Sequence, residues 1–272
     1  MTARDIRKNP QPNRGILNCD CINGKCINMK WNFFLLLFCV FIIACSDNEE
    51  TGIPMETPES TAINILPLGA SRVQGARPVH ESYRYELWQL IINAESNIDF
   101  IGNEIDASGY SDIMGQSFDR DHEGHGGFTS GQILERLEGW LEDIPVPDIV
   151  LFSSPGGNDA LGGLPFENIQ VNVNAIIDML QDRNPSVTII IEKLAPARSD
   201  LMTGQLLDYF VRMQDEVDLI AADQTTDNSK VIVVDMATGF QDNMLADAVH
   251  YNTTGAKFIA VRYFTVLQDL LN

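Results

Sequence analysis

The sequence predicts an α/β protein, a three-layer α/β/α sandwich around a five-stranded parallel sheet, from three observations. Apolar runs of strand length recur along residues 61–272, and longer segments with the apolar spacing of helices separate them. The later runs are apolar almost throughout, which is typical of parallel strands covered on both faces. No internal repeat of about 20–50 residues is visible along the chain.

Each element follows from its local pattern. The first run, at 62–68, ends at Gly69, and the first helical segment has Leu87, Leu90 and Ile91 on one face. The expected strands are 62–68, 98–101, 148–153, 186–191 and 230–235. The expected helices are 83–94, 129–142, 171–181, 201–217 and 255–271.

A Gly- and Asp-rich segment at 102–127 is expected to be a loop, and Thr129 or Ser130 would cap the helix that follows it. Ligands of parallel α/β sheets bind at the carboxyl ends of the strands. The residues directly after each strand are therefore where chemistry is expected.

The composition excludes several classes of protein. Apolar residues make up 44% and charged residues 21%, so the chain can bury a core and is not globally disordered. A net charge of −20 argues against general nucleic-acid binding and against a basic membrane-binding patch. The charge is uneven, because residues 1–45 carry six Lys and Arg against two Asp and Glu. A basic N-terminal segment followed by an acidic remainder of the chain is typical of an exported protein.

The cysteines follow the same division. All five lie in the first 45 residues, so the body offers no disulfide, thiol nucleophile or thiolate zinc site. Cys19, Cys21 and Cys26 have the spacing of a metal knuckle but lack a fourth ligand and a surrounding core. Cys45 directly follows the apolar run 31–44, whose roughly 14 residues are short for a membrane-spanning helix.

That run suits the hydrophobic segment of a signal peptide, and an uncleaved signal anchor is the alternative. Its end, Ile-Ile-Ala-Cys45, resembles a bacterial lipobox, which implies that Cys45 is lipidated and becomes the first mature residue. Met29 begins a well-formed signal, so we interpret 1–28 as an over-extended N-terminus and 29–45 as a lipoprotein signal peptide.

The acidic, proline-containing stretch 46–60 is expected to be a flexible tether, and residues 61–272 are expected to form the folded domain. This organisation predicts an exported lipoprotein on the periplasmic or cell-surface side of a bacterial membrane. Its lipid would be the only contact with the membrane.

Four candidate residues for catalysis follow expected strands or precede the last helix. Ser71 follows the first strand, where its hydroxyl is either a nucleophile or simply part of a turn. Asn158 lies in a Gly-Gly-Asn-Asp segment that either forms a turn or presents an amide to an oxyanion. Asp247 precedes His250 by three residues, so it could fix one ring nitrogen and leave the other as a base. A lone histidine at a helix start is more often a cap.

The expected loop also carries the segment His122-Glu-Gly-His125-Gly126-Gly127. Two histidines suggest a metal, but a Gly-rich loop does not aim both imidazoles in one direction and no cysteine is near, so no metal site is expected. Adjacent glycines before a helix suit a bare backbone N–H that faces an anion.

In their order along the chain, these segments resemble the four blocks of the SGNH hydrolases, also called GDSL-type esterases. The resemblance covers nearly all of 61–272 and is closest to the acetylxylan esterases of carbohydrate esterase family 3. Those enzymes carry PLGDS, GYR-x-x-LW, DFVG, HEGHSGWT, a PD-to-GTND block and D-x-VH. The corresponding segments are 67–71, 82–88, 99–102, 122–129, 147–159 and 247–250.

The resemblance implies the flavodoxin-like SGNH fold and a serine esterase that removes short acyl groups, mostly acetyl, from a polysaccharide such as xylan. It implies Ser71 as nucleophile, His250 as base and Asp247 as the residue that orients it. The oxyanion hole would consist of the Asn158 amide and the backbone N–H groups of Gly127 and Ser71. No metal or organic cofactor is required.

Several residues depart from the family pattern. Ala70 stands in place of an Asp that orders the turn, Gly126 in place of a Ser, and Tyr251 in place of a Pro after the histidine. Residues 153–155, Ser-Ser-Pro, also replace the apolar residues that usually lead to the block containing Asn158. These departures keep open a different class of function, a catalytically weakened glycan-binding lipoprotein.

Within the enzymes, the alternative is a lysophospholipase or thioesterase of the same superfamily. The sequence shows no long apolar lid for a fatty chain, and a preference for acetate over octanoate esters would favour the glycan substrate. Phe128, Trp88 and Tyr251 are candidates to stack on sugar rings, although Trp88 is expected in the core.

Overall fold

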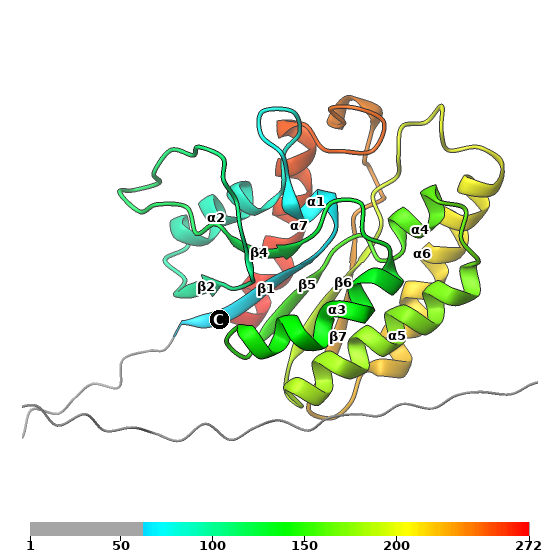
Figure 1. Cartoon of the computed structure of the whole chain (residues 1–272). Coiled ribbons are helices and arrows are strands. Elements are labelled where there is room, and N and C mark those ends of the chain that lie inside the picture. Colours follow the sequence, from blue (N-terminus) through cyan, green and yellow to red (C-terminus); the bar gives the residue numbers. More distant parts are fainter. Residues whose placement is uncertain (1–61, 272) are drawn as a thin grey trace, which may run out of the picture. The chain divides into compact units, whose positions relative to one another are not determined.

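A central sheet organises residues 62–271, which are the residues described by the computed structural model (Figure 1). The strands are β1 (Ile63–Gly69), β2 (Ile98–Phe100), β3 (Glu104–Ile105), β4 (Asp121–Gly124), β5 (Ile149–Phe152), β6 (Thr188–Lys193) and β7 (Lys230–Asp235). The expected N-terminal extension, signal peptide, tether and Cys45 lie outside the described residues. No helix within 62–271 is long and apolar enough to cross a membrane.

Helices cover both faces of the sheet (Figure 1). They are α1 (Ser71–Gln74), α2 (Arg84–Asn93), α3 (Ser130–Asp143), α4 (Gly157–Leu161), α5 (Phe166–Arg183), α6 (Gly204–Gln224) and α7 (Thr253–Leu271), with a 3₁₀ turn η1 (Asp242–Met244). Helices α2 and α7 pack on one face, and α3, α5 and α6 pack on the other. The predicted three-layer α/β/α sandwich is confirmed.

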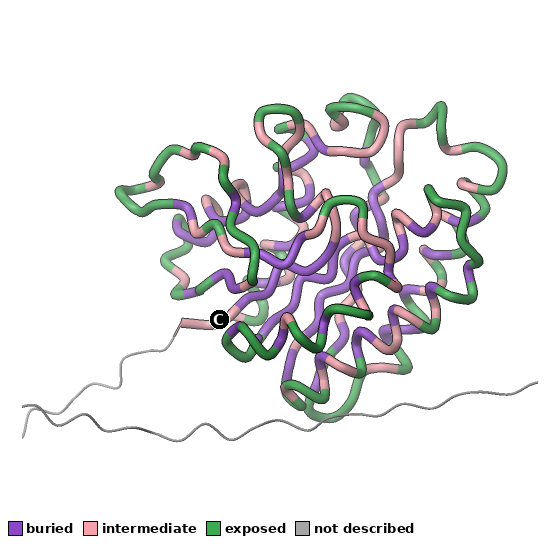
Figure 2. The backbone as a smooth tube through the Cα atoms, viewed as in Figure 1, coloured by how far each residue is buried: buried purple, intermediate pink, exposed green. Residues whose placement is uncertain are grey.

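The burial pattern of β1 explains why three layers are stable. Leu66 and Leu68 point into the core under α3, α5 and α6, whereas Ile65 points into the core under α2 and α7. All three side chains are fully buried. Figure 2 shows the central strands as buried, and helices cover them on both faces, which accounts for their nearly continuous apolar sequences.

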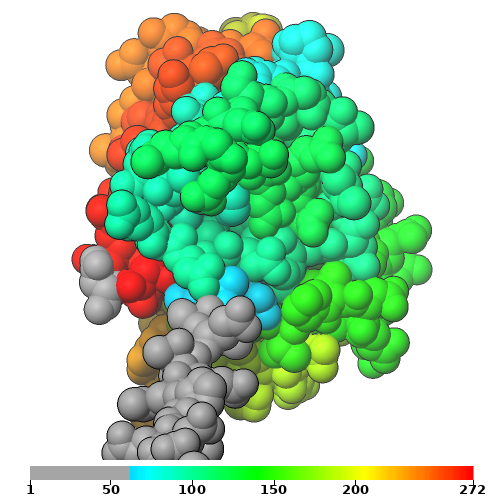
Figure 3. Space-filling view, turned by 90° about the vertical axis from the view of Figure 1, so that its left-hand side faces the viewer, coloured from blue at the N-terminus to red at the C-terminus, as the bar shows by residue number. Residues whose placement is uncertain are grey.

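All five expected strands are present, and two further strands lie in the segment 102–127 that was expected to be a loop. β4 runs parallel to β1 and pairs only with its last residues, Leu68 and Gly69. β3 pairs antiparallel with β4. Neither added strand contains an apolar run, so neither could be recognised from hydrophobic pattern. The segment from β2 to β4 covers this edge of the molecule (Figure 3).

Two helices are longer than expected. α5 begins at Phe166 rather than 171, because Phe166 and Ile169 already contribute to the core. α6 runs from Gly204 to Gln224 rather than over 201–217, because Ile220 and Ala221 continue its buried face.

Trp88 is buried against Phe100, which confirms its expected place in the core. Tyr251 is fully buried and its ring packs edge-on against Phe240. The expectation that Tyr251 stacks on a sugar ring is therefore wrong: the ring is inaccessible to a polysaccharide.

The strand order places a crevice beside the end of β1. β1 has β2 and β4 on one side and β5 on the other, and the chain continues through β6 to β7. The order of the sheet reverses between β1 and β5, which is where ligands of open α/β sheets bind. Ser71 follows β1 and Asn158 follows β5, so both lie at this switch point.

A buried arginine supports the turn after β1. The side chain of Arg84 is fully buried, donates to the carbonyl oxygens of Val73 and Gln74, and forms a 2.9 Å ion pair with Asp106. Removing one partner of a buried pair leaves the other charge uncompensated.

We therefore expect Arg84→Met to lower the free energy of unfolding by about 3–5 kcal/mol, measured by urea denaturation. Arg198→Met is the matched control, because the pair of Arg198 with Asp200 is exposed to solvent and contributes little. Equal losses in the two variants would contradict the structural role of the buried pair.

Candidate functional site

A tight turn places Ser71 at the carboxyl end of β1. A Cβ atom at Gly69 would lie 2.8 Å from the Val73 side chain and 2.9 Å from the Ser153 carbonyl oxygen, so only glycine fits there. The carbonyl oxygen of Ala70 accepts hydrogen bonds from the N–H groups of Val73 and Gln74. Ser71 is the first residue of α1, so its own N–H has no acceptor within that helix.

Three predicted site residues form one hydrogen-bonded chain. The Ser71 Oγ lies 2.9 Å from Nε2 of His250, and Nδ1 of His250 lies 2.7 Å from Oδ2 of Asp247. An ionised carboxylate can only accept, so Nδ1 carries the proton of a neutral ring. Nε2 is then left as the acceptor for the Ser71 hydroxyl.

Local hydrogen bonds hold Asp247 in its charged form. Its Oδ1 accepts the backbone N–H groups of Val249 and His250, each at 2.8 Å. Partial burial raises the pKa of Asp247, but these N–H groups and the His250 ring outweigh it and lower the pKa to about 2. The spacing of three residues therefore allows one carboxylate to bind both the backbone and the ring of His250.

The two glycines before α3 have different environments. The N–H of Gly126 donates to Oε1 of Gln74 at 3.1 Å. Gly127 has a φ of +82°, which favours glycine, and within the described residues its N–H has no acceptor. Of the two N–H groups, that of Gly127 is therefore available to a ligand.

Asn158 borders the same cleft as Ser71. Its Nδ2 donates to the carbonyl oxygen of Phe128 at 2.8 Å, which leaves the second amide hydrogen for another acceptor. The segment around it is a short helix, α4, rather than the plain turn that was the alternative. Asp159 anchors α4, because its buried carboxylate accepts the N–H and hydroxyl of Ser130 at 2.8 and 2.7 Å.

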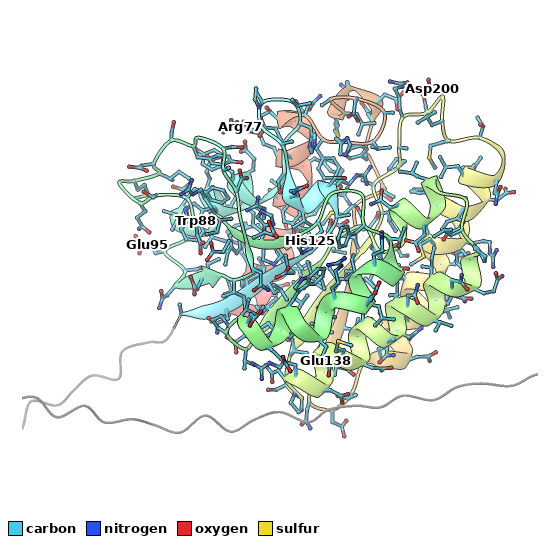
Figure 4. The ribbon with its side chains drawn as sticks, viewed as in Figure 1. Arg77, Trp88, Glu95, His125, Glu138 and Asp200 are labelled. Atoms are coloured by element: carbon cyan, nitrogen blue, oxygen red, sulfur yellow. The ribbon has the colours of Figure 1, made fainter. Side chains whose placement is uncertain are left out.

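The two histidines of the predicted Gly-rich loop have structural partners. His125 lies beside α3 (Figure 4), and its Nε2 lies 2.6 Å from Oε1 of buried Glu123. Its ring stacks on that of Trp140, with the centroids 4.1 Å apart. Burial, with Arg84 adding to it, lowers the pKa of His122 to about 3. Among residues 62–271, no three His, Cys, Asp or Glu side chains cluster in a way that could hold a metal ion.

Phe128 also belongs to this stacked group. It is partly buried, and its ring lies 5.1 Å from that of His125. The group of Glu123, His125, Trp140 and Phe128 thus fixes the course of the chain on both sides of Gly127.

The structure adds Arg72, which the sequence reasoning missed. Its guanidinium donates to the carbonyl oxygens of Val249, Ala195 and Pro196 at 2.9, 2.7 and 3.3 Å. It also lies 4.8 Å above the Tyr251 ring. An arginine next to a candidate nucleophile was a visible signal, but its backbone acceptors could not be read from the sequence.

His80 is a second missed residue. Its ring stacks on that of His250, with centroids 4.1 Å apart and planes 16° from parallel. Burial lowers the pKa of His80 and the neighbouring His250 lowers it further, although Asp247 opposes this. The N–H of Glu81 donates to the carbonyl oxygen of Tyr251 at 2.9 Å, which keeps the His80 loop against the His250 segment.

The charge state of Asp247 gives a test of this geometry. A carboxylate with a lowered pKa stabilises the folded state above its unfolded pKa, and that stability is lost as the pH falls towards about 2. We expect the stability advantage of the wild type over Asp247→Asn, measured by urea unfolding, to shrink from pH 5 to pH 3. The effect is modest because solvent screens this half-exposed group. An equal gap at both pH values would contradict the assignment.

Solved structures resemble this chain over most of its length. A carbohydrate esterase family 3 protein from Talaromyces cellulolyticus is 27% identical, with a TM-score of 0.67, and the match covers 77% of this chain and 98% of that one. The family 3 carbohydrate esterase of Clostridium thermocellum is 28% identical, with a TM-score of 0.63, and the match covers 78% of this chain and 100% of that one. An acetyl xylan esterase, AlAXEase, shares the fold at 17% identity and a TM-score of 0.57.

No curated protein matches the sequence. A family model, described as the GDSL-like Lipase/Acylhydrolase family, matches residues 96–258, more than half of the chain. The match includes Gly127, Asn158, Asp247 and His250. The chain therefore belongs to the GDSL-like lipase/acylhydrolase family, is a carboxylic ester hydrolase of the SGNH type, and is similar in structure to the carbohydrate esterases of family 3.

Proposed function

We propose that this protein is a serine esterase that removes short acyl groups, acetyl among them, from a polysaccharide such as xylan. The observation that carries the proposal is the hydrogen-bonded chain from Ser71 through His250 to Asp247. The choice of substrate is supported by the likeness to family 3 carbohydrate esterases and to a protein described as an acetyl esterase.

In the first half of the reaction, Nε2 of His250 takes the proton of the Ser71 hydroxyl while Oγ attacks the ester carbonyl carbon. The carbonyl oxygen becomes an oxyanion that accepts hydrogen bonds from the N–H groups of Gly127 and Ser71 and from the Asn158 amide. Asp247 stabilises the His250 imidazolium. His250 then gives its proton to the leaving sugar oxygen, and an acyl-Ser71 remains.

In the second half, water replaces the sugar. His250 takes a proton from the water, whose oxygen attacks the acyl carbon, and the same donors stabilise the second oxyanion. Collapse breaks the bond to Ser71 Oγ, and His250 returns the proton to it. The carboxylic acid leaves, and the site is restored.

Hydrolysis of 4-nitrophenyl acetate and release of acetate from acetylated xylan test the proposal. We expect Ser71→Ala to reduce both to background, and Asn158→Ala to lower kcat by about 10²–10³, the usual cost of one oxyanion donor. Near-normal turnover in Ser71→Ala would refute the assignment of the nucleophile. A wild type that binds xylan but turns over no ester would favour a glycan-binding protein.

We further propose that the enzyme is an exported lipoprotein anchored through Cys45, which would hold the domain beside extracellular or periplasmic glycans. The lipobox-like segment of the sequence supports this location. In bacterial cells fed an alkyne-labelled fatty acid, the wild-type chain is expected to carry the label and Cys45→Ala to lack it. Equal labelling of both chains would exclude Cys45 as the anchor.

A further inference from the structure

The hairpin of residues 76–80 lies beside the segment that leads into α7 (Figure 1). The N–H of Ala76 donates to the carbonyl oxygen of His80 at 3.1 Å, and the N–H of His80 donates back to the carbonyl oxygen of Ala76 at 3.3 Å. Val79, at the tip, is 73% exposed. His80 instead turns its ring toward that of His250, with the two centroids 4.1 Å apart.

Contacts on either side of His80 hold the hairpin in place. Arg77 forms an ion pair with Glu81 at 3.2 Å, and its guanidinium lies 5.0 Å from the centre of the Tyr110 ring. The N–H of Glu81 donates to the carbonyl oxygen of Tyr251 at 2.9 Å. The backbone around His80 is therefore bound both to its own hairpin and to the start of the last helical segment.

The stacked ring restrains a motion of His250 that its hydrogen bonds restrain only weakly. The bonds to Asp247 and Ser71 are made at Nδ1 and Nε2, along the edge of the ring, so they oppose sliding in its plane more strongly than tilting out of it. The plane of the His80 ring lies 16° from parallel to that of His250. The two rings are in contact, so His80 blocks the tilt on its side.

The neutral form of His80 suits this position. Its Nδ1 is buried and has no hydrogen-bond partner within the described residues, so a proton there would lack an acceptor. Burial lowers the pKa of His80 and the adjacent His250 lowers it further, against the opposing effects of Asp247 and the backbone of Glu81. The face of a neutral aromatic ring attracts a cation within about 6 Å. His250 becomes such a cation when it takes the proton of Ser71.

We propose that His80 is a positioning residue of the reaction, which holds the His250 ring in line with Ser71 and presents a neutral aromatic face to the imidazolium. This proposal rests on the proposed function, because it acts through the same His250. It assigns the role to the face of the His80 ring and not to its nitrogens. An aromatic ring without nitrogens should therefore replace His80, and a polar side chain without a ring should not.

His80→Gln and His80→Phe separate these two properties, with kcat and KM for 4-nitrophenyl acetate measured individually. A misplacement of about 1 Å can cost about 10²-fold in rate. Because the hydrogen bonds of His250 remain, we expect a smaller effect in His80→Gln, a loss of about tenfold in kcat with KM within about twofold of the wild type. His80→Phe should recover kcat to within about threefold of the wild type.

Val79→Ala is the matched control, because Val79 belongs to the same hairpin but is exposed at its tip. It should leave kcat and KM unchanged. An equal loss of kcat in Val79→Ala and His80→Gln would mean that any disturbance of the hairpin slows the enzyme, and it would overturn the role of the ring.

The failures of the two proposals can be told apart. If turnover depends on Ser71 but His80→Gln keeps the wild-type kcat, or changes only KM, the proposal for His80 is wrong and the esterase proposal stands. The same conclusion follows if His80→Phe is as slow as His80→Gln. If the wild type hydrolyses the ester no faster than Ser71→Ala, both proposals are overturned.

Discussion

The guanidinium of Arg72 is the interaction on which the geometry of the site depends, because it joins segments that are far apart in sequence. It lies next to Ser71 and donates to Val249, which precedes His250, and to Ala195 and Pro196 after β6. A charged donor that binds several carbonyl oxygens at once has one arrangement of low energy. The position of Ser71 relative to His250 therefore depends on how Arg72 is bound.

The buried carboxylate of Glu192 lies close enough to Arg72 to interact with its charge. Glu192 of β6 is fully buried and accepts the N–H of Ser154 and the hydroxyl of Tyr263, at 2.8 and 2.7 Å. Burial raises the pKa of Glu192, while these donors and the charge of Arg72 oppose the rise. The approach to Asn158 is thus fixed by polar groups in the core, in the segment whose sequence departs from the family pattern.

Much of the fold and of the site could be predicted from the sequence, because both depend on local pattern. Strands buried on both faces have continuous apolar runs, and a carboxylate three residues before a histidine can bind its ring within a single turn, as Asp247 and His250 do. Strand β4 could not be predicted, because Asp121–Gly124 contains no apolar run and is held to β1 by backbone hydrogen bonds, which leave no pattern in the sequence. The partners of Arg72 and the stacking of His80 on His250 could not be predicted from the sequence either, because they join segments that approach each other only in the folded chain.

The pairing of Gly69 with Gly124 has a consequence for the motions of the site. Ser71 follows the first of these residues by two positions and Gly127 follows the second by three, and the N–H of His125 continues the ladder to the carbonyl oxygen of Gly69. The proposed nucleophile and one of the proposed oxyanion donors are therefore held by the same pair of hydrogen-bonded strands. Little reorganisation is needed between them when charge develops on the substrate, and this preorganisation persists for as long as the sheet itself remains folded.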